Sequence, residues 1–390
     1  MSFSFTDDQR AIRDAARSFL SESVTSERLR AAIDTPAGMD DALWRSMAEE
    51  MGWLGVALPE RFGGLGLGAV ELAILMEETG RVLAPVPFFT TAAFGAPLIQ
   101  ACASEAQHAA LLPGLASGAT RIALCLTGKS GRPVPQDIPA TLSRGKGGMR
   151  LSGQAQYVAH GAAADLLLVI ARAPGSKAHD GLSVIALPKT AKGVTIHPLT
   201  SLDLTRPYAA VSFDNVTVAP DWVLGDAEAQ GAKLRHVLSV AAAMLAAEQL
   251  GGTDRVLEMS VDYVKQRMQF GRVIGSFQAI KHMLADMMIL GEASRSAAYY
   301  AACAIDDAPE ELEEAAAIAR AYCSDAYIRC SGDAVQAHGG IGFTWEHDAH
   351  FFFKRARATA SLLGDANHHR EIVARVLGLD EPSVQSASAP

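Results

Sequence analysis

YVKQRMQFGRVIGSFQAIKHMLADM, residues 263–287, joins two helical patterns through a short corner that contains a glycine. Apolar residues recur at helical spacing on both sides of this corner. They are Val256, Met259 and Tyr263 before it, and Ile280, Leu284 and Met287 after it. The pattern predicts the end of one core-packed helix, a tight turn and the start of a second helix.

Three polar residues of this corner, Arg267, Gln269 and Gln278, are not explained by helix packing. They surround Phe270-Gly271, where the backbone and the aromatic ring have room for a planar or phosphate-bearing group that the arginine neutralises. The alternative is that Arg267 is a solvated charge at a helix end, paired with a nearby carboxylate. Spacing alone leaves both interpretations open.

The composition is that of a globular chain with two or three domains: 390 residues, of which 49% are hydrophobic and 20% charged. The net charge of −9 and the lack of a basic stripe argue against a nucleic-acid partner. Five scattered cysteines without a Cys-x-x-Cys pair indicate neither a disulfide framework nor a zinc site, which favours a reducing cytoplasm. Neither a signal peptide nor a membrane span is expected.

The chain follows a helical pattern from its start to about residue 115. Thr6 followed by Gln9 is a capping-box signal for a first helix. Further helices are expected over residues 40–51 and 70–83, with Glu77 and Glu78 most simply explained as solvated charges on the latter. The glycine- and proline-rich stretch 52–68 between them predicts an irregular loop.

The period changes to two between about residues 120 and 225. Short β-branched or alternating runs occupy residues 149–158, 165–172, 181–187, 193–197 and 208–213. A run of strands enclosed by helical segments predicts a small antiparallel β domain inserted in a mainly α protein. The strands do not alternate with helices and no Gly-x-Gly-x-x-Gly occurs, so a dinucleotide-binding Rossmann domain is not expected.

The rest of the chain has few prolines and predicts long helices. Four amphipathic segments, roughly residues 231–267, 275–305, 309–337 and 360–378, fit a four-helix bundle. We therefore expect an N-terminal helical domain over residues 1–117, a middle β domain over 118–228 and a C-terminal bundle domain over 229–390.

A single carboxylate, Glu248, lies on the apolar face of the first bundle helix, which also carries Val237, Met244 and Gly252. Burying an unpaired carboxylate raises its pKa, and a raised pKa suits a general base near neutral pH. The alternative is that Glu248 is hydrated or paired with an arginine. The histidine pairs 347/350 and 368/369 lack a matching third ligand, so no metal is expected.

The pattern Y-x-x-x-R-x-Q-F-G-x-x-I-x-x-F-Q-x-x-K-x-x-L-A-D-M over residues 263–287 resembles a signature of the acyl-CoA dehydrogenase family. The run Gln336-Ala-His338-Gly339-Gly340-Ile341-Gly342 resembles the Q-x-x-G-G-x-G element of the same family. The resemblance implies a helical N-terminal domain, a β-barrel-like middle domain, a C-terminal four-helix bundle and an FAD cofactor. It further implies that six residues contact the FAD, in part from a neighbouring subunit: Arg267, Gln269, Phe270, Gln278, Gln336 and Gly340.

Three segments depart from the family pattern. The usual T-E-P-x-x-G-S-D stretch is replaced by residues 123–135, in which only Thr127 is in a comparable place, and the second flavin-side element reads Tyr157-Val-Ala-His160. Gly364 stands where many members carry their catalytic glutamate in Y-E-G-T. Some members place the base on the first bundle helix, so the resemblance offers Glu248 as the base and Asp365 as the fallback.

The resemblance implies FAD-dependent α,β-dehydrogenation of an acyl-CoA thioester, in which Glu248 takes the α-proton and an electron-transfer flavoprotein reoxidises the cofactor. A different class of function is a non-catalytic partner subunit. In some bacterial members, notably those acting on steroid side chains, two different chains share each flavin site. The chain is then expected in a homotetramer or in a heterotetramer with a paralogous chain. An acyl-CoA oxidase is a weaker third possibility.

Overall fold

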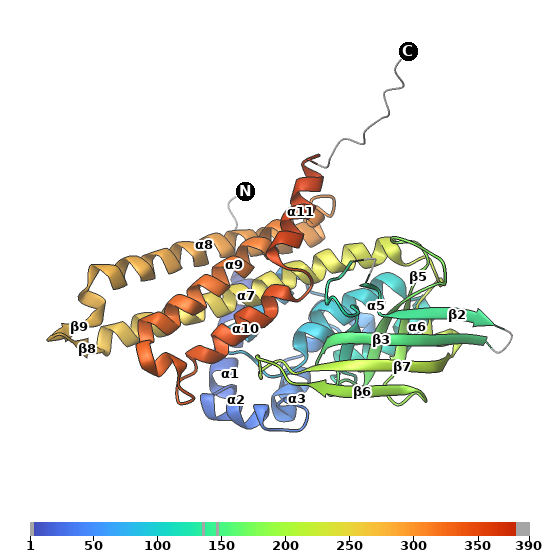
Figure 1. Ribbon diagram of the computed structural model, residues 1–390, viewed down its shortest axis with the longest axis horizontal. Helices are drawn as coiled ribbons and strands as arrows, with labels where there is room; N and C mark the ends of the chain where they lie inside the picture. The colour runs from blue at the N-terminus through green and yellow to red at the C-terminus, as the bar shows by residue number, and fades with distance from the viewer. Residues whose placement is uncertain (1–3, 135–136, 146–147, 380–390) are drawn as a thin grey trace, which may run out of the picture.

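A computed structural model describes residues 4–134, 137–145 and 148–379 of the chain. The outer ends of the expected first and third domains, together with Pro135, lie outside these residues. Figure 1 shows a group of long helices at one end of the molecule and a twisted sheet at the other, with the N-terminal helices packed between and below them.

The N-terminal part is helical, as its pattern predicts. Its α-helices are α1 Asp7–Ser23, α2 Ser26–Ile33, α3 Asp41–Glu49, α4 Ala69–Arg81, α5 Ala96–Cys102 and α6 Glu105–Ala116, with a π-helical segment η3 at Phe89–Gly95. The capping box at the start of α1 is confirmed, because the Thr6 hydroxyl accepts a hydrogen bond from the Gln9 amide at 3.1 Å and the Gln9 side chain accepts one from the Thr6 amide at 3.1 Å. The stretch 52–68 is irregular and holds two short 3-10 turns, η1 Trp53–Gly55 and η2 Glu60–Phe62.

The middle of the chain forms one sheet of seven strands. These are β1 Ile122–Cys125, β2 Ala140–Gly145, β3 Gly148–Ala159, β4 Leu166–Arg172, β5 Leu182–Pro188, β6 Val194–Leu199 and β7 Tyr208–Val218. The five expected runs are confirmed as β3 to β7, whereas β1 and β2 were not among them. A purely antiparallel sheet is also wrong in part, because β1 and β2 each run parallel to β4.

The two faces of this sheet lie in different cores. On β4, Leu168 and Ile170 join the large core shared with the helices. Leu167 and Val169, which point to the opposite face, join a separate core formed within the β domain itself. Because successive side chains of a strand alternate between faces and both faces are buried, β4 is a continuous hydrophobic run from Leu166 to Ala171 and ends at Arg172.

Up to residue 379, where the described residues end, the C-terminal part consists mainly of five α-helices and a hairpin. They are α7 Gly231–Gln266, α8 Gln278–Asp307, α9 Leu312–His338, α10 Ala349–Ser361 and α11 Ala366–Val376, with the hairpin β8 Met268–Gln269 and β9 Arg272–Val273 between α7 and α8. The tight corner is confirmed, since Phe270 and Gly271 both have left-handed φ values, 52° and 76°. Figure 1 shows this hairpin at the tip of the bundle.

The fourth bundle segment is not the single helix expected over residues 360–378. Leu363 and Gly364 have φ values of 62° and 96°, which no α-helix accommodates, so α10 ends at Ser361 and α11 starts at Ala366. Helical periodicity continued across this break because each flanking helix keeps its own apolar face.

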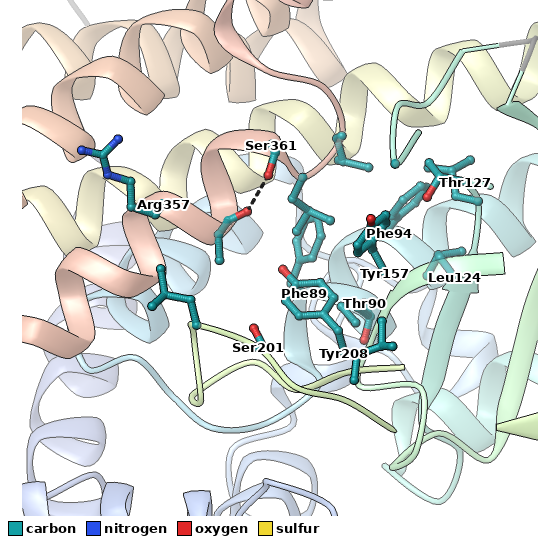
Figure 2. A pocket seen from close by; sticks show the side chains of 18 of the residues that line it. Phe89, Thr90, Phe94, Leu124, Thr127, Tyr157, Ser201, Tyr208, Arg357 and Ser361 are labelled. Atoms are coloured by element: carbon teal, nitrogen blue, oxygen red, sulfur yellow. Dashed lines mark hydrogen bonds between the residues drawn. The ribbon is translucent and has the colours of Figure 1, made fainter. Parts of the chain in front are cut away.

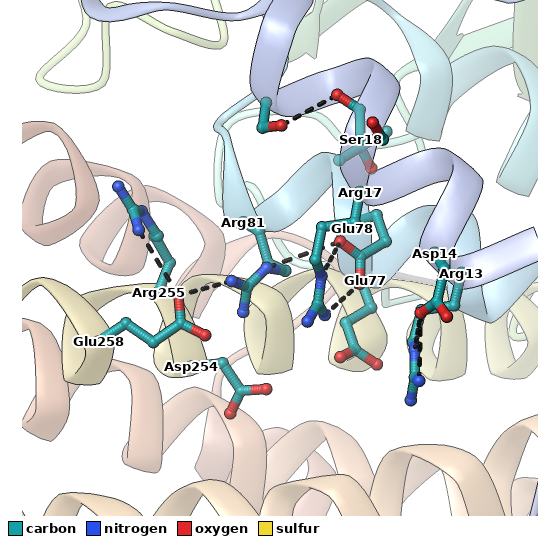
Figure 3. A network of polar contacts seen from close by, with 12 residues as sticks. Arg13, Asp14, Arg17, Ser18, Glu77, Glu78, Arg81, Asp254, Arg255 and Glu258 are labelled. Atoms are coloured by element: carbon teal, nitrogen blue, oxygen red, sulfur yellow. Dashed lines mark hydrogen bonds and ion pairs between the residues drawn. The ribbon is translucent and has the colours of Figure 1, made fainter. Parts of the chain in front are cut away.

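The interpretation of Glu77 and Glu78 as solvated charges is wrong. Both side chains are only 1% exposed, because α1, α7 and α8 cover this side of α4. Glu78 binds Arg17 of α1 at 2.6 Å, and Glu77 accepts hydrogen bonds from Arg295 at 3.0 Å and from the Tyr299 hydroxyl at 2.5 Å. Figure 3 shows how this network brings α1, α4 and α7 together.

Asp254 of α7 belongs to the same network and binds Arg295. Burial raises the pKa of Asp254 to about 6, and the negative charge of Glu77 adds to the rise although Arg295 opposes it. Burial also raises the pKa of Glu78. In the folded chain these carboxyl groups therefore hold protons at pH values where the unfolded chain has lost them.

We predict that Asp254→Asn flattens the dependence of folding stability on pH. Between the ordinary pKa of 3.8 and the folded pKa of about 6, the folded state binds more protons, so the wild-type free energy of unfolding falls as the pH rises through this window. Urea denaturation at pH values across the window measures the slope. The exposed Asp262 on the same helix provides the control, since Asp262→Asn is expected to keep the wild-type slope. An unchanged slope in Asp254→Asn would contradict the prediction.

Candidate active site

A cavity of about 540 Å³ lies between the sheet, η3 and the C-terminal end of α10. Its wall combines aromatic rings, from Phe89, Phe94, Tyr157 and Tyr208, with hydroxyl groups, from Thr90, Thr127, Ser130, Thr200, Ser201 and Ser361. Figure 2 labels eight of these side chains around the cavity, from elements far apart in the sequence: Phe89, Thr90, Phe94, Thr127, Tyr157, Ser201, Tyr208 and Ser361. Such a mixture suits a largely apolar or planar ligand that needs a few hydrogen bonds for its orientation.

Two wall residues have backbone conformations that non-glycine residues rarely adopt. Tyr157 has a φ of 55° and Leu363 a φ of 62°. Each such conformation costs about 1–3 kcal/mol and persists only where the surrounding structure enforces it. Strained residues collect at ligand sites, which supports this cavity as the functional one.

The two flavin-side segments that depart from the family pattern meet at this cavity. Thr127 follows β1, and its hydroxyl donates to the Gln156 carbonyl at 3.2 Å while its own carbonyl accepts from the Gln156 amide at 2.9 Å. Tyr157 and Ala159 of β3 then line the wall next to Thr127. The unusual residues therefore form part of the cavity wall.

No carboxylate and no imidazole is found among the described residues that line the cavity. Among the described lining residues, Arg357 is the one permanently charged side chain, and the other ionisable groups are Tyr157 and Tyr208. Burial raises the pKa of Tyr208 to about 12, so its hydroxyl stays protonated and can donate a hydrogen bond at neutral pH. The wall can thus orient a ligand, but it has no side chain that accepts a proton near neutral pH.

Glu248 lies outside this wall and is held between two arginines. It is buried on α7, where it binds Arg206, just before β7, and Arg355 of α10 at 3.1 Å. Burial favours a higher pKa, but the charges of Arg206 and Arg355 outweigh it and hold the pKa of Glu248 below its ordinary value. The expected raised pKa is wrong, and the alternative of pairing with an arginine is what the structure has.

The ion cluster extends to Asp203 and Thr205. Arg355 donates from Nε to the Asp203 carboxylate at 2.6 Å and from Nη2 to the Thr205 hydroxyl at 2.6 Å. Asp203, Thr205 and Arg206 all precede β7, while Glu248 and Arg355 belong to the bundle. The cluster therefore fastens the β domain to the bundle beside the cavity.

We predict that Glu248→Gln lowers the free energy of unfolding by about 3–5 kcal/mol, because it leaves two buried arginines without their shared counterion. The pKa of Glu248 is lowered in the folded state, so its stabilising contribution is present above the ordinary pKa of 4.5 and is lost as the pH falls through the folded pKa. Denaturation at neutral and at acid pH measures both effects. Glu371→Gln, at an exposed position on α11, is the control and is expected to change stability little. A loss below about 1 kcal/mol would contradict the ion cluster.

Asp365, the fallback base, has a structural contact as well. It is the N-cap of α11, and its carboxylate accepts a hydrogen bond from the His368 amide at 2.8 Å. It does not line the cavity, although Leu363 two residues earlier does. Gly364 has no side chain to offer, and a Cβ atom there would lie 2.3 Å from the His368 ring.

The six residues proposed to contact the cofactor lie at the far end of the bundle from the sheet (Figure 1). Arg267, Gln269, Phe270 and Gln278 are exposed on and beside the β8–β9 hairpin, and the Phe270 side chain is 91% exposed. Gln336 and Gly340 are exposed at the end of α9. The Tyr263 and His338 rings, 4.5 Å apart, hold the ends of α7 and α9 side by side.

None of these six residues lines the cavity. The six candidate cofactor contacts are therefore separate from the cavity, and all six are exposed. Arg267 makes no ion pair with a carboxylate in the described part of the chain, so the alternative of pairing with a nearby carboxylate is not what the structure has. An exposed arginine that no described carboxylate neutralises fits a phosphate-bearing cofactor.

Sequence reasoning missed Arg206, Arg355 and Asp203. A signal was present, because a carboxylate on an apolar helix face needs a buried cation. Which arginine supplies it is a question of tertiary packing, since Arg206 and Arg355 are 42 and 107 residues away from Glu248.

Within the described ranges, no group of three or more histidine, cysteine, aspartate or glutamate side chains is arranged to hold a metal ion. In the same ranges, no helix combines the length and apolar character that crossing a membrane requires.

Two family models match the chain. The model described as "Acyl-CoA dehydrogenase, N-terminal domain" covers residues 6–119, and the one described as "Acyl-CoA dehydrogenase, C-terminal domain" covers residues 232–378. Among curated proteins, acyl-CoA dehydrogenase IpdE2 of Mycobacterium tuberculosis is 32% identical over 371 residues, which is 95% of this chain and 96% of the relative.

Solved structures of similar proteins cover nearly the whole chain. The "Tcur3481-Tcur3483 steroid ACAD" structure contains a chain that is 30% identical with a TM-score of 0.84, over 96% of this chain and 98% of that one. The ChsE4-ChsE5 complex from Mycobacterium tuberculosis contains a chain that is 25% identical with a TM-score of 0.88, over 98% of this chain and 100% of that one.

Proposed function

The chain belongs to the acyl-CoA dehydrogenase family, and on that premise we propose that it serves in acyl-CoA dehydrogenation as the subunit without the catalytic base. One observation carries the proposal. The described wall of the cavity has no carboxylate, and the candidate base Glu248 is bound by two arginines.

The reaction class makes this observation decisive. Dehydrogenation of an acyl-CoA removes the α-proton of the thioester with a base and the β-hydrogen as a hydride, which FAD accepts when bound. A base has to reach its proton at hydrogen-bond distance, directly or through one water. Releasing Glu248 would leave the buried Arg206 without an ion-pair partner among the described residues and Arg355 with Asp203 alone, which costs several kcal/mol. A base from another chain avoids that cost.

This chain's own contribution is binding and orientation. Arg267 would pair with the diphosphate of FAD, Phe270 would pack on a planar part of it, and Gln269, Gln278 and Gln336 would donate hydrogen bonds beside Gly340. All six are exposed on one end of the bundle, so a neighbouring subunit can present its cofactor to them. The arginine acts as a fixed cation with several donors, which suits a diphosphate.

The partner in this proposal is a paralogous chain in a heterotetramer. Support comes from the ChsE4-ChsE5 complex, a similar structure that is named for two different chains. An electron-transfer flavoprotein is proposed as the electron acceptor and an acyl-CoA as the substrate. The proposed location is the cytoplasm, whose reducing conditions fit five free cysteines.

A self-sufficient homotetrameric dehydrogenase is the second candidate. The cavity of about 540 Å³, with its strained wall residues, favours it, because a chain that only completes another subunit's site does not require a cavity of its own. Glu248 or Asp365 would then have to act as the base after a local rearrangement.

The two candidates differ in the visible spectrum of the purified chain. We predict that the chain alone carries well below one flavin per chain, and that co-purification with a paralogous chain bearing the missing carboxylate restores a stoichiometric flavin spectrum. Absorbance between 300 and 550 nm, about the range where flavins absorb, measures this. Stoichiometric flavin in the chain alone, bleached by an added acyl-CoA, would favour the self-sufficient enzyme.

We predict that Arg267→Gln weakens FAD binding to the assembled enzyme by about tenfold or more, because it removes a charge-assisted hydrogen bond to the diphosphate. Thermal stability is expected to stay unchanged, since Arg267 is exposed. Titration of the FAD-free enzyme with FAD measures the affinity. Lys265→Gln, two residues earlier and also exposed, is the matched control. Equal affinities of the Arg267 variant and the wild type would remove Arg267 from the site.

A further inference from the structure

Arg320 of α9 is a buried cation without a carboxylate partner. Its side chain is 0% exposed, and no carboxylate of the described residues lies within ion-pair distance of its guanidinium. The carboxylate that acts on its charge, Glu248, is already shared by Arg206 and Arg355. Burial lowers the pKa of Arg320 to about 10, which still leaves it charged at neutral pH.

The guanidinium of Arg320 binds the end of α10 instead. Its Nη2 donates to the main-chain carbonyls of Thr359 and of Leu362, the latter at 2.7 Å. Its Nη1 donates to the Gln249 side-chain oxygen at 3.1 Å and to the Ser324 hydroxyl. Gln249 also donates to the Thr359 hydroxyl at 3.2 Å, so α7, α9 and α10 meet around this one cation.

The Thr359 carbonyl lies in the last turn of α10, where it also accepts a hydrogen bond from the Leu362 amide at 3.2 Å, and Leu362 is the residue that caps the helix. The same end of the helix carries the negative pole of its dipole. A cation placed there donates hydrogen bonds to the carbonyl oxygens and is attracted by the negative pole. The end of α10 therefore acts on Arg320 as a carboxylate does in an ordinary ion pair. The contact therefore fixes the position at which α10 stops.

The residues that follow this stop line the cavity. Ser361, Leu362 and Leu363 form part of its wall, and Leu363 and Gly364 have the left-handed φ values that separate α10 from α11. A φ of 62° is a backbone conformation that leucine rarely adopts. An enforcing contact is needed, and the two carbonyl hydrogen bonds from Arg320 are directly adjacent to it.

We propose that Arg320 is a positioning residue that holds the turn 361–365 in place as the wall of the cavity. The inference rests on the proposed function only in that the cavity is taken as the ligand site. In this proposal Arg320 lies behind the wall and does not line the cavity, yet it sets the shape of the turn 361–365. Other family members carry their base at this turn.

Hydrogen–deuterium exchange of the purified full-length chain tests this proposal. The Leu362 amide donates to Thr359 and the Gly364 amide to Ser361, each at 3.2 Å, so both report on the turn. In Arg320→Met these amides are expected to exchange about tenfold faster or more, because charge-assisted hydrogen bonds are lost. Arg320→Lys is expected to restore part of the protection, since it keeps the cation but not the fork that reaches two carbonyls.

Arg329→Met is the matched control, since it makes the same change at an exposed position of the same helix and is expected to leave the turn unaffected. A rise confined to residues 359–366, reduced in the lysine variant, supports the proposal. Unchanged exchange in the turn overturns it, and so does a rise of equal size throughout α7 and α9. If Arg320→Met does not fold, the test uses Arg320→Lys. A rise in amide exchange confined to residues 359–366 is again the expected result, and it is smaller than in the methionine variant.

The measurement uses neither flavin nor acyl-CoA. If the proposed function is wrong, for instance because the chain binds its own flavin and has its own base, the exchange result is unaffected. If the exchange test shows that the turn does not depend on Arg320, the flavin result is unaffected. The two proposals therefore succeed or fail separately.

Discussion

The buried ion cluster around Glu248 is the interaction on which the arrangement of this molecule depends. Glu248 of α7 joins Arg206, just before β7, to Arg355 of α10, and Arg355 continues to Asp203. Removing such charges from water costs several kcal/mol each unless they are paired. The ion pairs therefore favour the relative position of sheet and bundle in which these charges are paired. The cavity lies between the sheet, η3 and α10 in this position.

The same constraint accounts for the lack of a carboxylate among the described residues of the cavity wall. The carboxylate on the bundle helix that faces this region is used to neutralise arginines, which lowers its pKa rather than raising it. The segment after α10, where a base would enter the wall, ends in a left-handed turn at Leu363 and Gly364 instead. Arg320 holds the helix end just before this turn. Structural charges thus surround the cavity while its wall provides aromatic rings and hydroxyls.

The candidate cofactor contacts and the cavity lie at different ends of the bundle. The hairpin that carries Arg267 and Phe270 is exposed at one end, and the cavity adjoins the sheet at the other. Within one copy of the chain the length of the helices α7 and α8 separates the two. An assembly in which one subunit's hairpin reaches another subunit's cavity is the arrangement that uses both ends, whether the subunits are identical or paralogous.

The sequence by itself determined the helical corner at residues 263–287, the strand-rich middle and the capping box at Thr6, because local backbone preferences and periodicity are written in consecutive residues. It also pointed to the exposed polar residues of the corner. Only the tertiary structure decided that Glu248 is paired, that Glu77 is buried and that the last bundle segment breaks at Leu363. Protonation and burial depend on neighbours far away in the chain, as Arg355 is from Glu248, and no local pattern records them.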